Sequence, residues 1–226
     1  MERTYYSYSS GSTYSMSKVF GWMFYAILIT ALTSLGVPYL LVYFGVPELY
    51  NPLLFIGLIS VFILCFVAQR IIMTSRTKAT PIVVFTLFAV SMGLWISPLV
   101  ISYDLTSIVY TLFITSAIFG IMAIYGAVTK RDLTGFGSFL FMLLLGSIIL
   151  TLFNTLFAGS MGLNWFLSYL TLGIYIGFIA YDVQKVKRIA ESGQLSNNIS
   201  LLMALNLYID FVYVFIRLLS LIRRKN

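Results

Sequence analysis

Long apolar stretches separated by short polar segments dominate the pattern of hydrophobic positions along the chain. Each stretch is longer than the ~20 residues that an α-helix needs to span the ~30 Å hydrocarbon core of a bilayer. Strands of a membrane barrel would alternate apolar and polar side chains, and these stretches do not alternate. The pattern therefore predicts an all-α membrane protein with seven transmembrane helices. The stretches lie at residues 19–44, 51–73, 80–101, 106–128, 136–158, 164–184 and 199–222.

The amino-acid composition supports this class. Of the 226 residues, 60% are hydrophobic and 9% are charged, whereas a soluble domain carries about 25% charged residues. The net charge of +7 comes largely from basic residues gathered in short loops, so we interpret it as a topology signal and not as a nucleic-acid-binding surface. We expect an integral, multi-pass protein in contact with the lipid bilayer, in the plasma membrane (the inner membrane if the chain is prokaryotic).

Cysteine and histidine usage excludes several kinds of site. Cys65 is the only cysteine, so an intrachain disulfide and a thiolate metal cluster are excluded. The chain has no histidine, so any response to pH near neutrality falls to carboxyl groups. Walker and Rossmann fingerprints are absent. We expect no resident cofactor and no enzymatic activity.

Loop charge predicts the orientation of the helices, because basic residues stay on the cytosolic side. Alternate loops are basic, and the loops between them carry Glu48, Asp104 or no charge, which places the N-terminus in the cytosol. The seventh helix conflicts with this rule, since the tail after it reads Arg223-Arg224-Lys225. We favour a full crossing, with re-entry and return to the cytosol as the alternative. The basic loop residues are Arg70, Arg76, Lys78, Lys130, Arg131, Lys185, Lys187 and Arg188.

The domain organisation is simple. Residues 1–17 are rich in Tyr and Ser and predict a disordered cytosolic arm. Every loop is short, so residues 18–226 predict a single seven-helix transmembrane domain with no soluble domain attached.

Two aspartates inside the predicted helices are the strongest candidates for function, because a charge at the centre of a membrane helix costs roughly 2.5 to 3.5 kcal/mol. Asp182 lies at the cytosolic end of the sixth helix, where an interfacial ion pair with Lys185 is the alternative interpretation. Asp210 lies in the middle of the seventh helix. There the alternative is a protonated, inert carboxyl group that bonds to a neighbouring helix.

Three further polar residues share one face of the seventh helix with Asp210. Asn206, Asp210, Tyr213 and Arg217 follow the spacing i, i+4, i+7, i+11. Such a stripe is expected to face the bundle interior or a water-filled path. Arg70 begins about one turn inside the cytosolic end of the second helix, from where it either snorkels to the headgroups or pairs with the aspartates.

The chemistry of a shared site follows from the two carboxyl groups. If Asp182 and Asp210 meet, repulsion and desolvation make one of them hold its proton more strongly. With that proton the two groups can be bridged, and without it they repel each other or recruit a cation. Carboxylate oxygens are also ligands for Ca²⁺, so the pair is a candidate for transient calcium contact. These residues indicate a proton-operated gate for cations.

Five groups of residues form a recognisable set. They are Gly93-Leu94 with Ser97-Pro98; Tyr125-Gly126 with Thr129-Lys130-Arg131-Asp132-Leu133; Gly137-Ser138-Phe139-Leu140; Tyr181-Asp182-Val183-Gln184; and Ala204-Leu205-Asn206-Leu207-Tyr208-Ile209-Asp210-Phe211. Together they resemble the hallmarks of the Bax inhibitor-1 family, also called the transmembrane Bax inhibitor motif family, in its prokaryotic type. The resemblance covers most of the fourth to seventh predicted helices and parts of the second and third.

The resemblance implies a fold in which the seventh helix is central and the other six surround it. It also implies a pH-sensitive calcium leak across the membrane, with Asp182 and Asp210 as the family's aspartyl dyad and Arg70 as the arginine that latches it. The alternative function in the family is a non-conducting regulator of a membrane protease or of cell-death machinery, which acts through protein partners. Nothing in the sequence separates the two functions.

Two other classes of protein fit the sequence less well. An intramembrane aspartyl protease also uses two membrane aspartates, but it needs glycines just before the second one, where this chain has the bulky Leu207, Tyr208 and Ile209. A receptor of the G-protein-coupled type shares only the number of helices, and the predicted cytosolic N-terminus argues against it.

Overall fold

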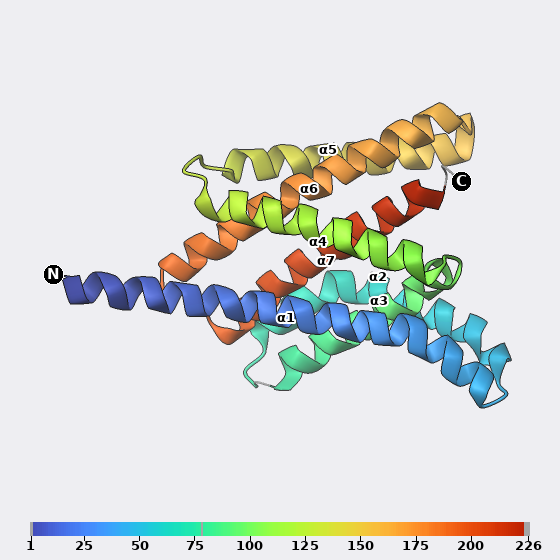
Figure 1. The fold of residues 1–226 in the computed structure, drawn as a ribbon, viewed down its shortest axis with the longest axis horizontal. Coiled ribbons are helices and arrows are strands. Elements are labelled where there is room, and N and C mark those ends of the chain that lie inside the picture. Colours follow the sequence, from blue (N-terminus) through green and yellow to red (C-terminus); the bar gives the residue numbers. More distant parts are fainter. Residues whose placement is uncertain (1, 78, 224–226) are drawn as a thin grey trace. The chain divides into compact units, whose positions relative to one another are not determined.

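The computed structural model describes residues 2–77 and 79–223, and it describes the side chains of residues 16–221 except at positions 78 and 158. Within these ranges the chain forms seven long α-helices (Figure 1), which confirms the predicted all-α class. The helices are α1 (Glu2–Tyr43), α2 (Tyr50–Thr74), α3 (Ala79–Ile101), α4 (Leu105–Val128), α5 (Thr134–Phe153), α6 (Met161–Glu191) and α7 (Asn197–Arg223). A 3-10 turn (Pro47–Leu49) precedes α2, and a π-helical turn (Asn154–Ala158) follows α5.

All seven helices are long and apolar enough to cross a bilayer, as the sequence predicts. Most of the spans begin and end within a few residues of the predicted limits. The exception is α6, which continues to Glu191, where the sequence predicts an end at residue 184. Lys185, Lys187 and Arg188 end the apolar stretch but are good helix formers, so the backbone stays helical beyond it.

The first helix also starts earlier than predicted. It begins at Glu2, within the segment for which the sequence predicts a disordered arm, whereas its membrane-spanning part begins at Met16. Extending a helix from an existing nucleus costs far less than starting one, so a long apolar helix can carry a polar extension. Polarity in residues 1–17 therefore marks the end of the span and not the end of the helix.

The seventh helix runs without a break from Asn197 to Arg223. At 1.5 Å per residue its 27 residues extend about 40 Å, which is enough for a full crossing. The described residues contain no turn within α7 at which the chain would re-enter. Of the basic tail that conflicts with the loop-charge rule, Arg224 and Lys225 lie outside the described residues.

The chain packs as two compact units, and the single transmembrane domain that the sequence predicts stays a prediction. The first unit comprises Met1–Leu105 and Ile189–Tyr208, and the second comprises Thr106–Arg188 and Ile209–Asn226. The boundary falls inside α7, so the first half of this helix belongs to the first unit and the second half to the second. The central position of the seventh helix concerns both units at once and stays a prediction.

Small residues bring the helices of the first unit close together. A Cβ atom on Gly57 of α2 would lie 2.7 Å from the Leu94 Cβ of α3, and one on Gly93 of α3 would lie 2.8 Å from the Thr30 carbonyl oxygen of α1. The Thr30 hydroxyl is hydrogen-bonded to the hydroxyl of Tyr208, which is fully buried on α7. These contacts give the first unit a core around α3.

The second unit is built in the same way from α4, α5, α6 and the end of α7. Gly126 of α4 packs directly on the backbone of α6 at Ala180. Gly177 of α6 faces the Leu140 side chain of α5, and these two helices lie side by side (Figure 1). Glycine is needed at these crossings because a side chain would push the helices apart. The sixth helix is therefore held between α4 and α5.

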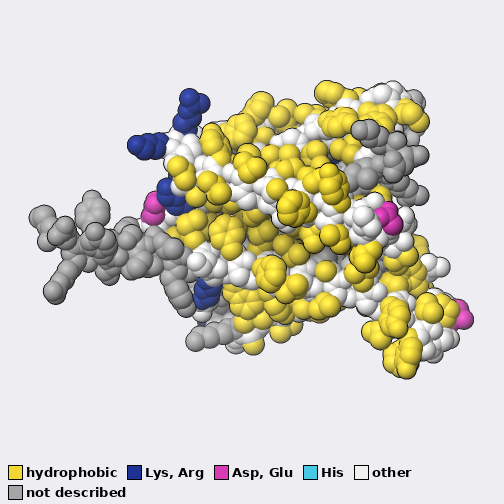
Figure 2. Space-filling model, in the orientation of Figure 1, with side chains coloured by type: hydrophobic (Ala, Val, Ile, Leu, Met, Phe, Trp, Pro, Cys, Tyr) yellow, Lys and Arg dark blue, Asp and Glu magenta, His cyan; other side chains and the backbone are white. Residues whose placement is uncertain are grey.

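The surface matches a lipid environment. Hydrophobic side chains cover the helices in the displayed face, and the Lys and Arg side chains lie at helix ends (Figure 2). Many large apolar residues are more than half exposed, for example Phe113 at 75% and Phe62 at 67%. Such exposure would be unfavourable in water and is expected of helices that face acyl chains.

Candidate functional site: a buried pair of aspartates

Asp182 of α6 and Asp210 of α7 meet inside the second unit. Their exposed fractions are only 8% and 6%, and the two carboxyl groups are hydrogen-bonded to each other. Ionised carboxylates only accept hydrogen bonds, so a bond between two of them requires a proton on one. The sequence places Asp210 deeper along its helix than Asp182, but the structure brings the two groups together. Two carboxyl groups in such contact can share a single proton.

One oxygen of the pair is left without a partner. Asp210 Oδ2 is buried and accepts no hydrogen bond among the described residues. Buried polar atoms are nearly always hydrogen-bonded, so an exception in a membrane helix indicates a functional site. Lys185, one turn along α6, attracts the Asp182 carboxylate electrostatically. The pair therefore keeps capacity to accept a further proton donor or a cation.

Glycines on two neighbouring helices position Asp182. A Cβ atom on Gly126 of α4 would lie 2.3 Å from the Ala180 carbonyl oxygen, and one on Gly137 of α5 would lie 2.5 Å from the Tyr181 ring. Ala180 and Tyr181 are the two residues before Asp182. Backbone and ring contacts at these positions leave α6 little freedom to slide or rotate, so the depth of Asp182 is set by close packing.

The loop between α4 and α5 is fastened to α6 just beyond Asp182. The Gln184 side chain, which is 5% exposed, accepts a hydrogen bond from the Leu133 backbone N–H at 2.9 Å and donates one to the Arg131 carbonyl oxygen at 2.7 Å. The Lys187 ammonium group donates to the Ala127 carbonyl oxygen at 2.7 Å. The end of α4 and the start of α5 thus share one anchor on α6.

An ion pair continues this anchor outside the membrane-spanning segments. Arg188 donates to an Asp132 carboxylate oxygen at 2.7 Å and to the Thr134 hydroxyl at 2.8 Å. Hydrogen bonds from the Thr134 side chain and backbone, together with Arg188, lower the pKa of Asp132 to about 2. Both charged groups are exposed, so the pair fixes geometry more than it adds stability.

Gln184, Asp132 and Arg188 belong to this site, although sequence reasoning did not assign them a role. Two of them lie in motifs that the sequence analysis names, Tyr181-Asp182-Val183-Gln184 and the loop after Tyr125-Gly126. Their pairing joins residues about fifty positions apart, which helical periodicity cannot reveal. The usable signal was a polar side chain, Gln184, two residues after a membrane aspartate.

The polar face predicted for the seventh helix divides between the two units. Asn206 is half-buried in the first unit. Tyr213 and Arg217 line a pocket of about 220 Å³ in the second unit, together with residues of α5 and α6. The Tyr213 ring stacks on Tyr175 of α6, with ring centroids 4.6 Å apart and planes within 4°. Beyond Asp210, α7 therefore faces a pocket that is lined by both polar and apolar side chains.

Arg70 lies in the first unit, near the end of α2, and its side chain is exposed. Its backbone carbonyl accepts a hydrogen bond from the Thr74 hydroxyl at 2.8 Å. This position suits a guanidinium that snorkels to headgroups. Its pairing with the aspartates, which belong to the other unit, stays a prediction.

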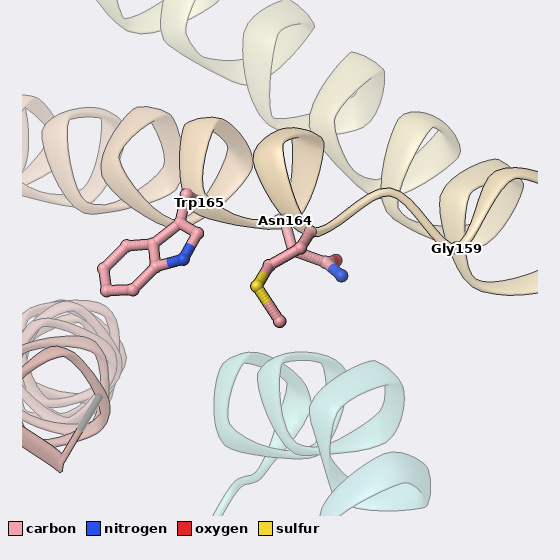
Figure 3. Close-up of a pocket in the computed structure, with 4 residues that line it drawn as sticks. Gly159, Asn164 and Trp165 are labelled. Carbon is pink, nitrogen blue, oxygen red and sulfur yellow. The ribbon is translucent and has the colours of Figure 1, made fainter. Parts of the chain in front are cut away.

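A second pocket, of about 310 Å³, lies where α5 turns into α6 (Figure 3). Asn164 and Trp165 project into it from the first turns of α6, and Gly159 lies in the turn itself, with a φ of 56° that favours glycine. The buried Asn154 side chain closes this turn through hydrogen bonds with both the N–H and the carbonyl of Ser160. This pocket lies at the opposite end of α6 from Asp182.

The aspartate pair cannot by itself hold a resident calcium ion. Ca²⁺ takes six to eight oxygen ligands, and among the described residues no group of three or more His, Cys, Asp or Glu side chains comes together. A calcium ion that passes the pair would have to keep most of its ligands as water. Transient contact of the two carboxyl groups with Ca²⁺ stays a prediction.

The part of the chain that matches known proteins includes this whole site. The family described as "Inhibitor of apoptosis-promoting Bax1" matches residues 13–226. The inner membrane protein YbhL of Escherichia coli (strain K12) is 34% identical over 218 residues, which cover 93% of this chain and 92% of that protein. A protein of Rickettsia prowazekii is 34% identical over 97% of this chain and 93% of its own length. A membrane protein of Streptococcus pyogenes serotype M3 is 33% identical over 78% and 77%.

Proposed function

Since the chain belongs to the Bax inhibitor-1 family and is a multi-pass protein of the inner membrane, we propose that it is a pH-sensitive leak pathway for calcium. The gate is the pair formed by Asp182 and Asp210. The observation that carries the proposal is the hydrogen bond between their carboxyl groups, within segments long and apolar enough to span the membrane. A proton is part of this bond, so the state of the pair depends on pH.

The gating step follows from the charges. Loss of the shared proton leaves two negative charges in a site with little water, and an opposite charge nearby then becomes favourable. We assign that role to Arg70, whose guanidinium would hold the ionised pair and keep the path closed. Protonation of the pair removes the partner of Arg70 and releases it. Acidification is therefore expected to open the path.

Two features support this order of events. The carboxyl groups are bonded to each other, and the Arg70 side chain is exposed, as expected of a proton-loaded pair and a released arginine. The unpartnered Oδ2 of Asp210 offers a passing cation an oxygen that no protein donor occupies. We therefore expect Asp210 to govern pH dependence more strongly than Asp182.

Calcium entry into liposomes that contain the purified protein tests the proposal. We expect the wild type to leak faster at mildly acidic than at mildly alkaline pH, and Asp210→Asn to lose this dependence. Asp182→Asn is expected to weaken it less. Glu48→Gln is the matched control, because it removes an exposed carboxyl group from the turn before α2 and should leave the flux unchanged.

The leak pathway would be overturned if no calcium flux were measured, or if Asp210→Asn left the flux unchanged at every pH. The pair would then act as a conformational switch in a non-conducting regulator. In that case Asp210→Asn would change the set of membrane proteins that co-purify with the chain, without any change in ion flux.

A further inference from the structure

The pocket beyond the aspartate pair contains a cation, Arg217, for which the described residues provide no counterion. Arg217 of α7 is half-buried on the wall of this pocket, and among the described residues its side chain makes no hydrogen bond and no ion pair. A guanidinium in a largely apolar protein region is unfavourable unless an anion or several acceptors surround it. The pocket is therefore electrostatically incomplete.

The surrounding helices cannot supply that anion. The pocket is formed by α5, α6 and α7, and the sequence contains no Asp or Glu between Asp132 and Asp182 or after Asp210. Asp210 lies seven residues before Arg217, about 10 Å along the helix, and it is already bonded to Asp182. None of the three helices that form the pocket therefore supplies a counterion for Arg217, and we look for one outside the protein.

The position of Arg217 along its helix indicates which molecule that is. Arg217 lies one turn before Leu221, the last residue of the membrane-spanning segment, or roughly 6 Å along the axis. An arginine at this depth reaches the headgroup region, where lipid phosphates lie. Arginine also binds phosphate through two parallel hydrogen bonds, which a lysine cannot do.

The α5 wall of the pocket fits the rest of a lipid. Leu144, Ile148 and Leu152 are four residues apart and form an apolar row about 12 Å long, against which an acyl chain can lie. On the same helix, the hydroxyls of Ser147 and Thr151 also line the pocket. Each donates its hydrogen to a carbonyl of its own helix, at 2.7 Å, so its oxygen can only accept from a ligand.

From this combination we infer that the pocket around Arg217 binds the phosphodiester headgroup of a membrane phospholipid. Arg217 holds the phosphate, the apolar row of α5 contacts an acyl chain, and the hydroxyl oxygens of Ser147 and Thr151 accept from donors on the headgroup. Lipids with an ammonium or hydroxyl donor, such as phosphatidylethanolamine and phosphatidylglycerol, are preferred over phosphatidylcholine, which has none. The site is independent of the proposed calcium leak.

Lipid retention by the purified protein, measured by native mass spectrometry in detergent with each lipid added in turn, tests the site. We expect the wild type to retain phosphatidylethanolamine and phosphatidylglycerol more than phosphatidylcholine. Arg217→Gln should weaken retention about tenfold, the loss expected for charge-assisted hydrogen bonds, and Arg217→Lys should weaken it less. Arg76→Gln is the matched control, because this arginine is exposed in the loop between α2 and α3.

A second variant keeps the test decisive if Arg217→Gln does not fold. Thr151→Val preserves the shape of an exposed residue and removes one acceptor, so the preference for donor-bearing lipids should fall while total lipid retention persists. Equal retention of all three lipids by the wild type and by both variants would overturn the site. Arg217-dependent stabilisation by inorganic phosphate but not by lipid would show a site for a soluble anion instead.

Discussion

The contact between Gly126 and α6 makes the position of Asp182 sensitive to a single methyl group. In Gly126→Ala the new Cβ would lie 2.3 Å from the Ala180 carbonyl oxygen and 3.0 Å from the Ala180 carbonyl carbon and Cα. Carbon–oxygen contacts are normally about 3.3 Å or longer. All three obstructing atoms belong to the backbone, so no side-chain rotation relieves the overlap, and α4 and α6 must separate by about 1 Å.

Gly120→Ala on the same helix isolates the cost of this separation, because nothing lies within 4 Å of the Cβ that it would add. Both variants gain the same helix propensity, about 1 kcal/mol. Forcing an extra methyl group into a packed contact costs about 1–3 kcal/mol, which only Gly126→Ala incurs. The two variants should therefore differ in thermal midpoint by roughly 2–12 °C, with Gly126→Ala the lower.

Thermal unfolding of the two purified variants in detergent measures this difference directly. The same shift of α6 moves Asp182, two residues beyond Ala180, so Gly126→Ala should also alter the pH dependence of calcium flux while Gly120→Ala leaves it intact. Equal midpoints for the two variants would refute the close α4–α6 packing, and with it the account of how Asp182 is positioned.

Three further predictions concern Gln184, Asp132 and Arg70. Gln184→Ala leaves one N–H and one carbonyl of the α4–α5 loop unpaired, so trypsin should cut this loop faster than in the wild type; equal cleavage rates would contradict the anchor. Hydrogen bonds from Thr134, and after them Arg188, lower the pKa of Asp132 from 3.8 to about 2 in the folded protein, so the stability from these contacts is present above about pH 3.8 and is lost as the pH falls through about 2. Thermal midpoints that fall over this interval in the wild type and not in Asp132→Asn would confirm it, and parallel curves would not. Arg70→Ala should raise calcium flux at mildly alkaline pH, and an unchanged flux would mean that this arginine only snorkels.

The sequence was informative about the spans because the bilayer imposes a strict rule. Every backbone group in the hydrocarbon core must bond internally, so apolar runs of this length can only be helices. Asp182 and Asp210 could also be recognised from the sequence, since a carboxyl group within such an apolar run is energetically costly. Helix ends outside the core were harder to predict, as α1 and α6 show, because water allows a helix either to continue or to stop.

The contacts of the site could not be read from periodicity. Glycines at positions 126 and 137 are equally compatible with a lipid-facing surface and with a helix crossing, and only the packed structure shows Ala180 and Tyr181 against them. The Gln184 anchor joins a helix to a loop about fifty residues earlier. Such pairings depend on which helix faces which, and hydrophobicity alone leaves that open when most helices are apolar on nearly all sides.

The seven membrane spans, and the two aspartates at positions where a charge is unfavourable, follow from the sequence alone, because length, apolarity and the cost of buried charge act on each segment separately. That Asp182 and Asp210 lie in contact, and that Arg217 lines a pocket with no counterion among the described residues, is visible only in the folded chain. These features depend on close approach between helices, which is set by small residues at a few crossings and by polar side chains that find partners far away in the chain.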